Sequence, residues 1–172
     1  MPGFVIHIAI AKEYLKKHDN IENVEEFIKG NVAPDLTDDK TKTHYGKSPT
    51  FTNLNQFLIH NKIDNSFNKG IFLHLIADYL FYNHYLKSIP VQGSKEILHN
   101  DYDLINKELI EKYNIELLDN IKQYVFCKDG KPQILTLNLI TKVIEEISSL
   151  NLEEVEQEVI EKNKKWETYK LI

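Results

Sequence analysis

The chain has 172 residues, of which 42% are hydrophobic, and its formal net charge at pH 7 is -5. This length allows one domain with a sizeable core, and the composition excludes a disordered polypeptide. All its basic residues are lysine, so bidentate arginine contacts to phosphate are excluded, and the charge balance suggests no strongly basic surface for nucleic acids. The single cysteine, Cys127, excludes an internal disulfide and a zinc site built from thiolates.

The apolar start of the chain is interpreted as a helix. It is interrupted by His7, and its lysines follow the apolar residues, whereas an export signal has its positive charges first. A cytoplasmic location is therefore expected. No run in the sequence approaches the roughly 20 apolar residues that span a bilayer, so no transmembrane segment is expected.

Apolar periodicity and capping residues predict helices in chain order over about 2–17, 24–29, 50–59, 66–86, 94–113, 116–125, 136–148 and 152–165. Gly30 is expected to end the second helix, and Ser66 to cap the central one. Asn151 and Glu154 form a capping box before the last helix. The C-terminal helices are expected to pack on the core, Trp166 to pack back onto the bundle, and a dimer contact is left open.

No strand pattern or internal repeat is found. The predicted fold class is therefore all-α, a single-domain multi-helix bundle around a buried central helix at about 66–86. The domain is expected to span 1–172, with a metal-binding core in 1–113 and packing helices in 114–172.

The central helix is apolar nearly all the way round, yet it contains His74, Asp78 and His84. Burying these groups without partners would cost several kcal/mol, and a bound cation would compensate. His74 and Asp78 are four residues apart, so their side chains can meet one ion. His84 lies roughly 80° to the other side of His74, and more naturally reaches a second ion unless the helix bends before it.

Further histidines and aspartates occupy apolar stripes or the irregular segment 30–49. His7 lies on the core-facing stripe of the first helix, and His99 and Asp103 are four residues apart on a later one. Imidazole and carboxylate without thiolate form the ligand set of catalytic zinc and related ions. The candidate metal ligands are His7, Asp35, His44, His74, Asp78, His84, His99 and Asp103, enough for two or three ions.

Each candidate also has an ordinary structural explanation. A lone histidine such as His7 on an apolar face is more often a hydrogen-bonded core residue than a ligand. His99 and Asp103 could form a surface ion pair, and Asp35 after proline is a common turn residue. Asp78 is the hardest to explain in this way, because buried aspartates are rare without a partner.

The chain resembles the zinc-dependent phospholipase C and nuclease P1 family. The resemblance rests on the order His, Pro-Asp, His, His-x-x-x-Asp-x-x-x-x-x-His and His-x-x-x-acid from His7 to Asp103. It implies a helical bundle that hydrolyses phosphate esters. One zinc ion would be held by Asp35, His44, His74 and Asp78. A second would be held by His84, His99 and Asp103. A third would be held by His7 and Asp78, with Asp78 as the bridge.

The chain departs from this family at two points. Secreted members bind one zinc through an N-terminal Trp, whereas this chain begins Met-Pro-Gly-Phe, so two zinc ions are expected and the third is left open. Asp103 stands where the family has Glu, one methylene longer.

The expected function is zinc-dependent hydrolysis of a phosphate ester, either a phospholipid headgroup or a nucleotide, by metal-activated water. Asp35 is the candidate catalytic residue, because it would orient the attacking water. A catalytically silent relative that binds metal or a phosphorylated ligand is the alternative. An HD-type phosphohydrolase ranks third. It needs an adjacent His-Asp pair in its metal site, but the pair in this chain, His18 and Asp19, is predicted at an exposed helix end.

Overall fold

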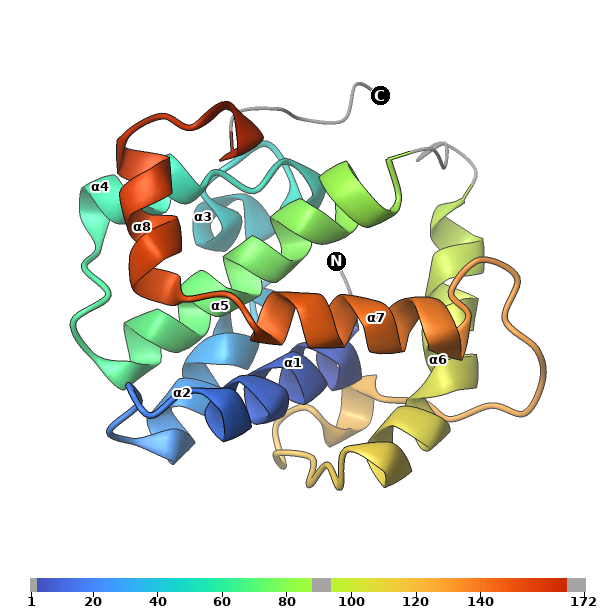
Figure 1. The fold of residues 1–172 in the computed structure, drawn as a ribbon. Coiled ribbons are helices and arrows are strands. Elements are labelled where there is room, and N and C mark those ends of the chain that lie inside the picture. Colours follow the sequence, from blue (N-terminus) through green and yellow to red (C-terminus); the bar gives the residue numbers. More distant parts are fainter. Residues whose placement is uncertain (1–2, 88–93, 167–172) are drawn as a thin grey trace.

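The computed structural model describes residues 3–87 and 94–166. Within these ranges the chain forms eight α-helices and no strand, which confirms the predicted all-α fold (Figure 1). The α-helices are α1 (Phe4–Lys17), α2 (Val24–Val32), α3 (Lys40–His44), α4 (Leu54–His60), α5 (Ser66–Leu80), α6 (Lys95–Lys112), α7 (Leu137–Ser148) and α8 (Leu152–Ile160). The short elements are 3-10 turns η1 (Ala33–Asp35), η2 (Pro49–Phe51), η4 (Lys122–Tyr124) and η5 (Lys164–Trp166), and the π-helical turn η3 (Phe81–Tyr85).

The central helix of the bundle is α5, as predicted. Every residue from Phe72 to Tyr79 is buried, so this helix has no solvent-exposed side over two turns. Helices α1, α2 and α8 pack around it, and α7 packs against α1 (Figure 1). Apolar side chains of all these helices form one continuous core.

Helix α2 does not end at Gly30, as the sequence predicted, but continues to Val32. A Cβ atom at Gly30 would lie 2.0 Å from the carbonyl oxygen of Phe67, and one at Gly70 would lie 2.1 Å from that of Phe27. Both glycines therefore serve the close approach of α2 to α5. The consequence for the site is that the backbone of Asn31 reaches the side chain of His74.

The cap of α5 is Asn65, one residue earlier than predicted. Its side chain accepts a hydrogen bond from the backbone N–H of Asn68. Ser66 instead accepts one from the backbone N–H of Asn23, which ties the start of α5 to the start of α2. The predicted cap of α8 is confirmed, since the Asn151 side chain accepts from the N–H of Glu154.

The helix predicted over about 116–125 is wrong, since only the η4 turn forms there. Asn114 has a left-handed backbone, φ 48°, just beyond α6. The chain then runs back along α6, where the Asn106 side chain donates to the carbonyl oxygen of Phe126 and the Lys128 N–H donates to that of Asp103. These tertiary hydrogen bonds hold the end of the segment against α6, which a modest helical propensity does not predict.

The last helix ends at Ile160, five residues before the predicted end. The chain turns at Lys162, where φ is 57°. Trp166 then packs on Tyr79 of the central helix, with ring centroids 5.5 Å apart, which confirms the prediction that it packs back onto the bundle.

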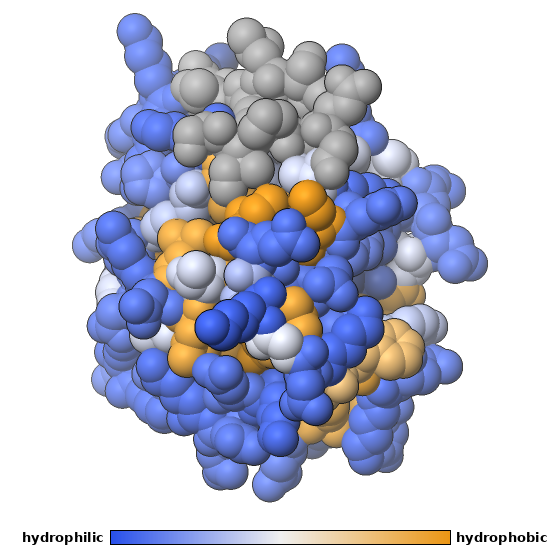
Figure 2. Space-filling view, turned by 90° about the vertical axis from the view of Figure 1, so that its right-hand side faces the viewer, coloured by the Kyte–Doolittle hydropathy of each residue, from blue (hydrophilic) through white to orange (hydrophobic). Residues whose placement is uncertain are grey.

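No helix in the described ranges combines the length and the apolar character that a membrane crossing needs. The face on the α6 side of the molecule is mostly hydrophilic, with hydrophobic side chains exposed in patches (Figure 2).

Candidate metal centre

Five of the eight predicted ligands meet in the interior of the bundle. His7 comes from α1, Asp35 from η1, His44 from α3, and His74 and Asp78 from α5. All five are buried. They form two overlapping groups, His7 with Asp35 and His74, and His44 with His74 and Asp78, in which the possible ligand atoms lie within 4.8 Å of one another.

Asp78 is the centre of this cluster. One carboxylate oxygen, Oδ2, lies 3.0 Å from His44 Nε2 and 3.6 Å from His74 Nε2. The other, Oδ1, lies 3.4 Å from His7 Nε2. Burial raises the pKa of Asp78, but nearby positive charge and the facing imidazoles outweigh burial and hold that pKa well below its usual value. The cluster therefore contains a buried negative charge surrounded by three imidazoles.

Two of these imidazoles have a fixed orientation. His74 Nδ1 lies 2.7 Å from the carbonyl oxygen of Asn31, and His44 Nδ1 lies 2.9 Å from that of Lys40. A carbonyl oxygen only accepts, so each Nδ1 carries a proton, and each Nε2 faces the interior, where its lone pair can bind a proton or a metal ion. Such a backbone contact on the outer nitrogen is the usual support of a metal-binding histidine.

His7 supplies a second indication of a bound cation. Both of its ring nitrogens are buried and neither makes a hydrogen bond within the described part of the chain. Burial and the charge of His74 lower the pKa of His7 to about 4, so the ring is neutral at pH 7. It stacks on His74, with centroids 3.8 Å apart. Its nearest polar neighbour is the Asp78 carboxylate, 3.4 Å from Nε2, which is beyond a good hydrogen bond, so a ring nitrogen of His7 remains available to a metal ion.

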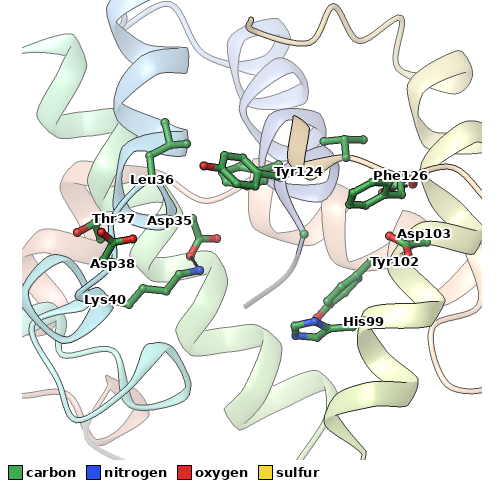
Figure 3. Close-up of a pocket in the computed structure, with 14 residues that line it drawn as sticks. Asp35, Leu36, Thr37, Asp38, Lys40, His99, Tyr102, Asp103, Tyr124 and Phe126 are labelled. Carbon is green, nitrogen blue, oxygen red and sulfur yellow. Dashed lines mark hydrogen bonds and ion pairs between the residues drawn. The ribbon is translucent and has the colours of Figure 1, made fainter. Parts of the chain in front are cut away.

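The buried cluster adjoins a cleft of about 720 Å³. Figure 3 shows Asp35 and Lys40 on one wall of this cleft, and Tyr102, His99 and Asp103 on the opposite wall, which is built by α6. Asp35 belongs both to the cluster and to the cleft lining. Asp35 is therefore the residue through which the buried cluster borders the cleft, while the three histidines of the cluster themselves are fully buried.

A family model described as zinc dependent phospholipase C matches residues 5–166. The chain belongs to the zinc-dependent phospholipase C family. The match confirms the predicted family, and it extends beyond the motif region into the C-terminal helices. No curated protein and no solved structure matches the chain significantly.

The remaining three candidate ligands of this family member lie apart from the two groups found in the described residues. His84 is exposed on the π-turn and packs edge-on against Tyr85. His99 is also exposed, and Asp103 forms an ion pair of 2.8 Å with Lys128. His99 and Asp103 nevertheless face the same cleft as Asp35. Their assignment, with His84, to a second metal stays a prediction.

The π-turn explains why the position of His84 could not be inferred from α-helical spacing. Each residue of a π-turn rotates less about the axis than in an α-helix, so the angle between His84 and His74 differs from the expected one. A bend of the helix before His84 was one of the two expectations, and the change from α5 to η3 occurs at Phe81.

Two polar residues, one in the cleft lining and one buried on α6, were missed in the sequence. Lys40 forms an ion pair with Asp35, with Nζ 2.7 Å from Oδ1. Asp101 is fully buried and accepts hydrogen bonds from the backbone N–H groups of Gln133, Ile134 and Leu135, which anchors the loop beyond Phe126 to α6. The burial of Asp101 could not be predicted, because in the sequence it looks like any other polar residue of an amphipathic helix. Lys40 could have been suspected, since a chain without arginine needs lysine near a phosphate site.

His18, the histidine of the HD-type alternative, makes structural contacts and does not belong to the buried cluster. Its Nε2 is hydrogen bonded to the carbonyl oxygen of Ser148 at 3.0 Å, and its ring stacks on Tyr14. His18 therefore ties the end of α1 to α7.

Proposed function

We propose that the protein is a zinc-dependent hydrolase of phosphate esters whose substrate binds in the cleft beside Asp35. The observation that carries the proposal is the continuity between two features, a buried cluster of three imidazoles and two carboxylates, and a cleft that shares Asp35 with it. Membership of the zinc-dependent phospholipase C family supports both the metal and the substrate class.

The side chains that would hold zinc are those whose ligand atoms converge. His44 and His74 are oriented by their backbone contacts with Nε2 inward, and His7 offers an unsatisfied ring nitrogen. Asp78 would bridge neighbouring ions, because its two oxygens face different imidazoles. Bound zinc would supply Lewis acidity toward a phosphoryl oxygen and would lower the pKa of water toward about 7.

Asp35 would act at the boundary between metal and substrate. Its carboxylate is only 1% exposed, yet the residue lines the cleft. A carboxylate at this place can accept a hydrogen bond from a water molecule and aim the oxygen at the phosphorus atom. The cleft volume lies within the range of small-molecule sites. Two exposed aromatic side chains at its edge, Tyr124 and Phe126, would contact the group esterified to the phosphate.

The proposal is tested with zinc-loaded protein and two generic substrates, a nitrophenyl phosphodiester and a nitrophenyl phosphomonoester. The wild-type chain is expected to turn over at least one of them faster than free zinc does. Asp78→Asn, which keeps the side-chain shape but removes the charge, is expected to abolish turnover. Asp64→Asn, at an exposed turn before α5, serves as the control. Absence of turnover by the zinc-loaded wild type on both substrates would contradict the proposal.

A second candidate function is a metal-binding relative without turnover. It is favoured by the Lys40–Asp35 ion pair, because the ammonium group competes with a metal ion for that carboxylate. Tight zinc binding through His44 and His74 without hydrolysis of either substrate would support this candidate.

A further inference from the structure

We propose that Lys40 is a substrate-binding residue, whose ammonium group holds the phosphoryl group of the ester in the cleft. The inference rests on the proposed function and names the side chain that recognises the anionic part of the substrate.

The position of Lys40 is the first observation. It is the first residue of α3, and its side chain is 28% exposed, while its partner Asp35 is almost fully buried. Figure 3 shows both side chains directed into the cleft from the same wall. The ammonium group therefore lies at the point where the cleft meets the buried cluster.

The charge of the cleft is the second observation. Among its described lining residues are three carboxylates, those of Asp35, Asp38 and Asp103, and a single lysine, Lys40. A phosphate ester would be repelled by such a lining unless cations face it. Because the chain contains no arginine, the amino group of Lys40 is the fixed positive charge best placed to donate charge-assisted hydrogen bonds to phosphoryl oxygens.

The backbone of Lys40 is the third observation. Its carbonyl oxygen lies 2.9 Å from Nδ1 of His44 and also accepts a hydrogen bond from the Thr43 hydroxyl. One residue thus orients a candidate ligand through its carbonyl group and reaches into the cleft through its side chain. The backbone of Lys40 is held beside the cluster by these contacts, and its ammonium group is held there by the ion pair with Asp35, a member of the cluster.

An alternative role for Lys40 is purely structural, namely to neutralise the buried carboxylate of Asp35. The two roles differ in their consequences. A structural lysine affects stability or metal affinity, whereas a substrate-binding lysine also affects the affinity for a phosphate anion when stability and metal content are unchanged.

The test measures binding of inorganic phosphate to the zinc-loaded chain by calorimetry, with zinc content determined for each sample. Lys40→Ala is expected to weaken phosphate binding about tenfold or more, and Lys40→Arg, which keeps the charge, is expected to restore most of it. Lys42→Ala is the matched control. Lys42 lies on the same short helix, but its side chain is 82% exposed and pairs with Asp39, so its loss is expected to leave phosphate affinity unchanged.

Equal phosphate affinity of wild type and Lys40→Ala at equal zinc content would overturn the inference, as would a wild type that does not bind phosphate. If Lys40→Ala fails to fold, Lys40→Gln keeps most of the apolar stem and answers the same question. Phosphate binding that depends on Lys40 without any hydrolysis would support the inference and refute the proposed hydrolase. Hydrolysis that proceeds with unchanged KM in Lys40→Ala would support the proposed hydrolase and refute the role of Lys40.

Discussion

The Nε2 atoms of His44 and His74 lie 3.2 Å apart in the core, and the Nδ1 atom of each ring faces a backbone carbonyl oxygen. Two lone pairs are thereby aimed at one point beside the Asp78 carboxylate. Such an arrangement is stable only with a cation in it, either a proton or a metal ion. Each histidine therefore has its own backbone partner at Nδ1, and the two rings share the Asp78 carboxylate at Nε2.

In the metal-free protein a proton would lie between the Nε2 atoms of His44 and His74. The free energy of unfolding should therefore depend on the protonation of these rings. Burial lowers the pKa of His74, but the charge of Asp78 outweighs burial and raises it above the ordinary 6.5. The stability that this proton supplies is present below pH 6.5 and is lost as pH rises through the raised pKa. The depressed pKa of His7, about 4, has the opposite effect, because stability then increases from pH 4 to 6.5.

We therefore expect the chelator-treated protein to be most stable at about pH 6 to 7 and to weaken on both sides. Urea unfolding at a series of pH values in the presence of chelator measures this. The decline above neutral pH should be absent in His74→Ala. A stability that keeps rising to about pH 9 in the chelated wild type would show that His74 holds no such proton.

Asp35→Asn is expected to lower kcat/KM for a phosphodiester by about 10² to 10⁴, because the amide cannot orient water as the carboxylate would. Asp38→Asn is the matched control, since Asp38 lines the same cleft but is exposed to solvent. Steady-state kinetics of the two zinc-loaded variants give the comparison. If both variants retain wild-type kcat/KM, Asp35 has no catalytic role.

The exposed aromatic pair at the cleft predicts a preference for esters with a large apolar group. Tyr124 and Phe126 are 55% and 59% exposed, so replacing both with Ala is expected to change the free energy of unfolding by less than about 0.5 kcal/mol. KM for a short-chain phospholipid should rise about tenfold, since two apolar contacts are lost. KM for a nitrophenyl phosphomonoester should be little affected.

Ile59→Ala, at a position 61% exposed on α4, controls for the loss of surface hydrophobicity. Equal losses on the phospholipid and the small ester would mean that the aromatic pair does not select the esterified group.

Close packing of α2 on α5 predicts large effects of two small substitutions. Gly30→Ala and Gly70→Ala each place a methyl group about 2 Å from a backbone carbonyl oxygen, so each is expected to cost about 3 kcal/mol or more in the free energy of unfolding. Gly3→Ala, whose Cβ would lie 3.4 Å from the Tyr102 ring, should be nearly neutral. Thermal and denaturant unfolding compare the three variants.

The same packing holds the Asn31 carbonyl oxygen at His74. A Gly30→Ala variant that still folds should therefore bind zinc more weakly. If the Gly30→Ala chain is as stable as the wild type, α2 and α5 do not approach each other as closely as this structure shows.

The central helix could be predicted from sequence because a helix that is buried on all sides appears as an apolar run with few polar residues. His74 and Asp78 follow from that run, and His7 from its place on an apolar stripe. What these cues did not contain was the direction of His84, because a π-turn depends on tertiary packing and not on the spacing of apolar residues.

Glycine was misread for a related reason. In the sequence Gly30 looks like the end of a helix. In the fold it is needed because the carbonyl oxygen of Phe67 leaves no room for a Cβ atom. The segment after α6 was misread as helix, although hydrogen bonds to Asp103 and Asn106 hold the residues just beyond it, Phe126 and Lys128, against α6. Local propensity carries no information on such contacts.

Elemental analysis of the purified chain decides whether the buried cluster holds a metal ion. We expect at least one tightly held zinc ion per chain in the wild type, and its loss in His74→Ala. The control His60→Ala, whose histidine is exposed at the end of α4, should keep the zinc ion. Chelator should lower the Tm of the wild type by roughly 5 to 10 °C, since zinc at about a hundred times its Kd stabilises by about 2.7 kcal/mol. A wild type that retains no zinc after equilibration, and whose stability neither chelator nor His74→Ala changes, would contradict this expectation.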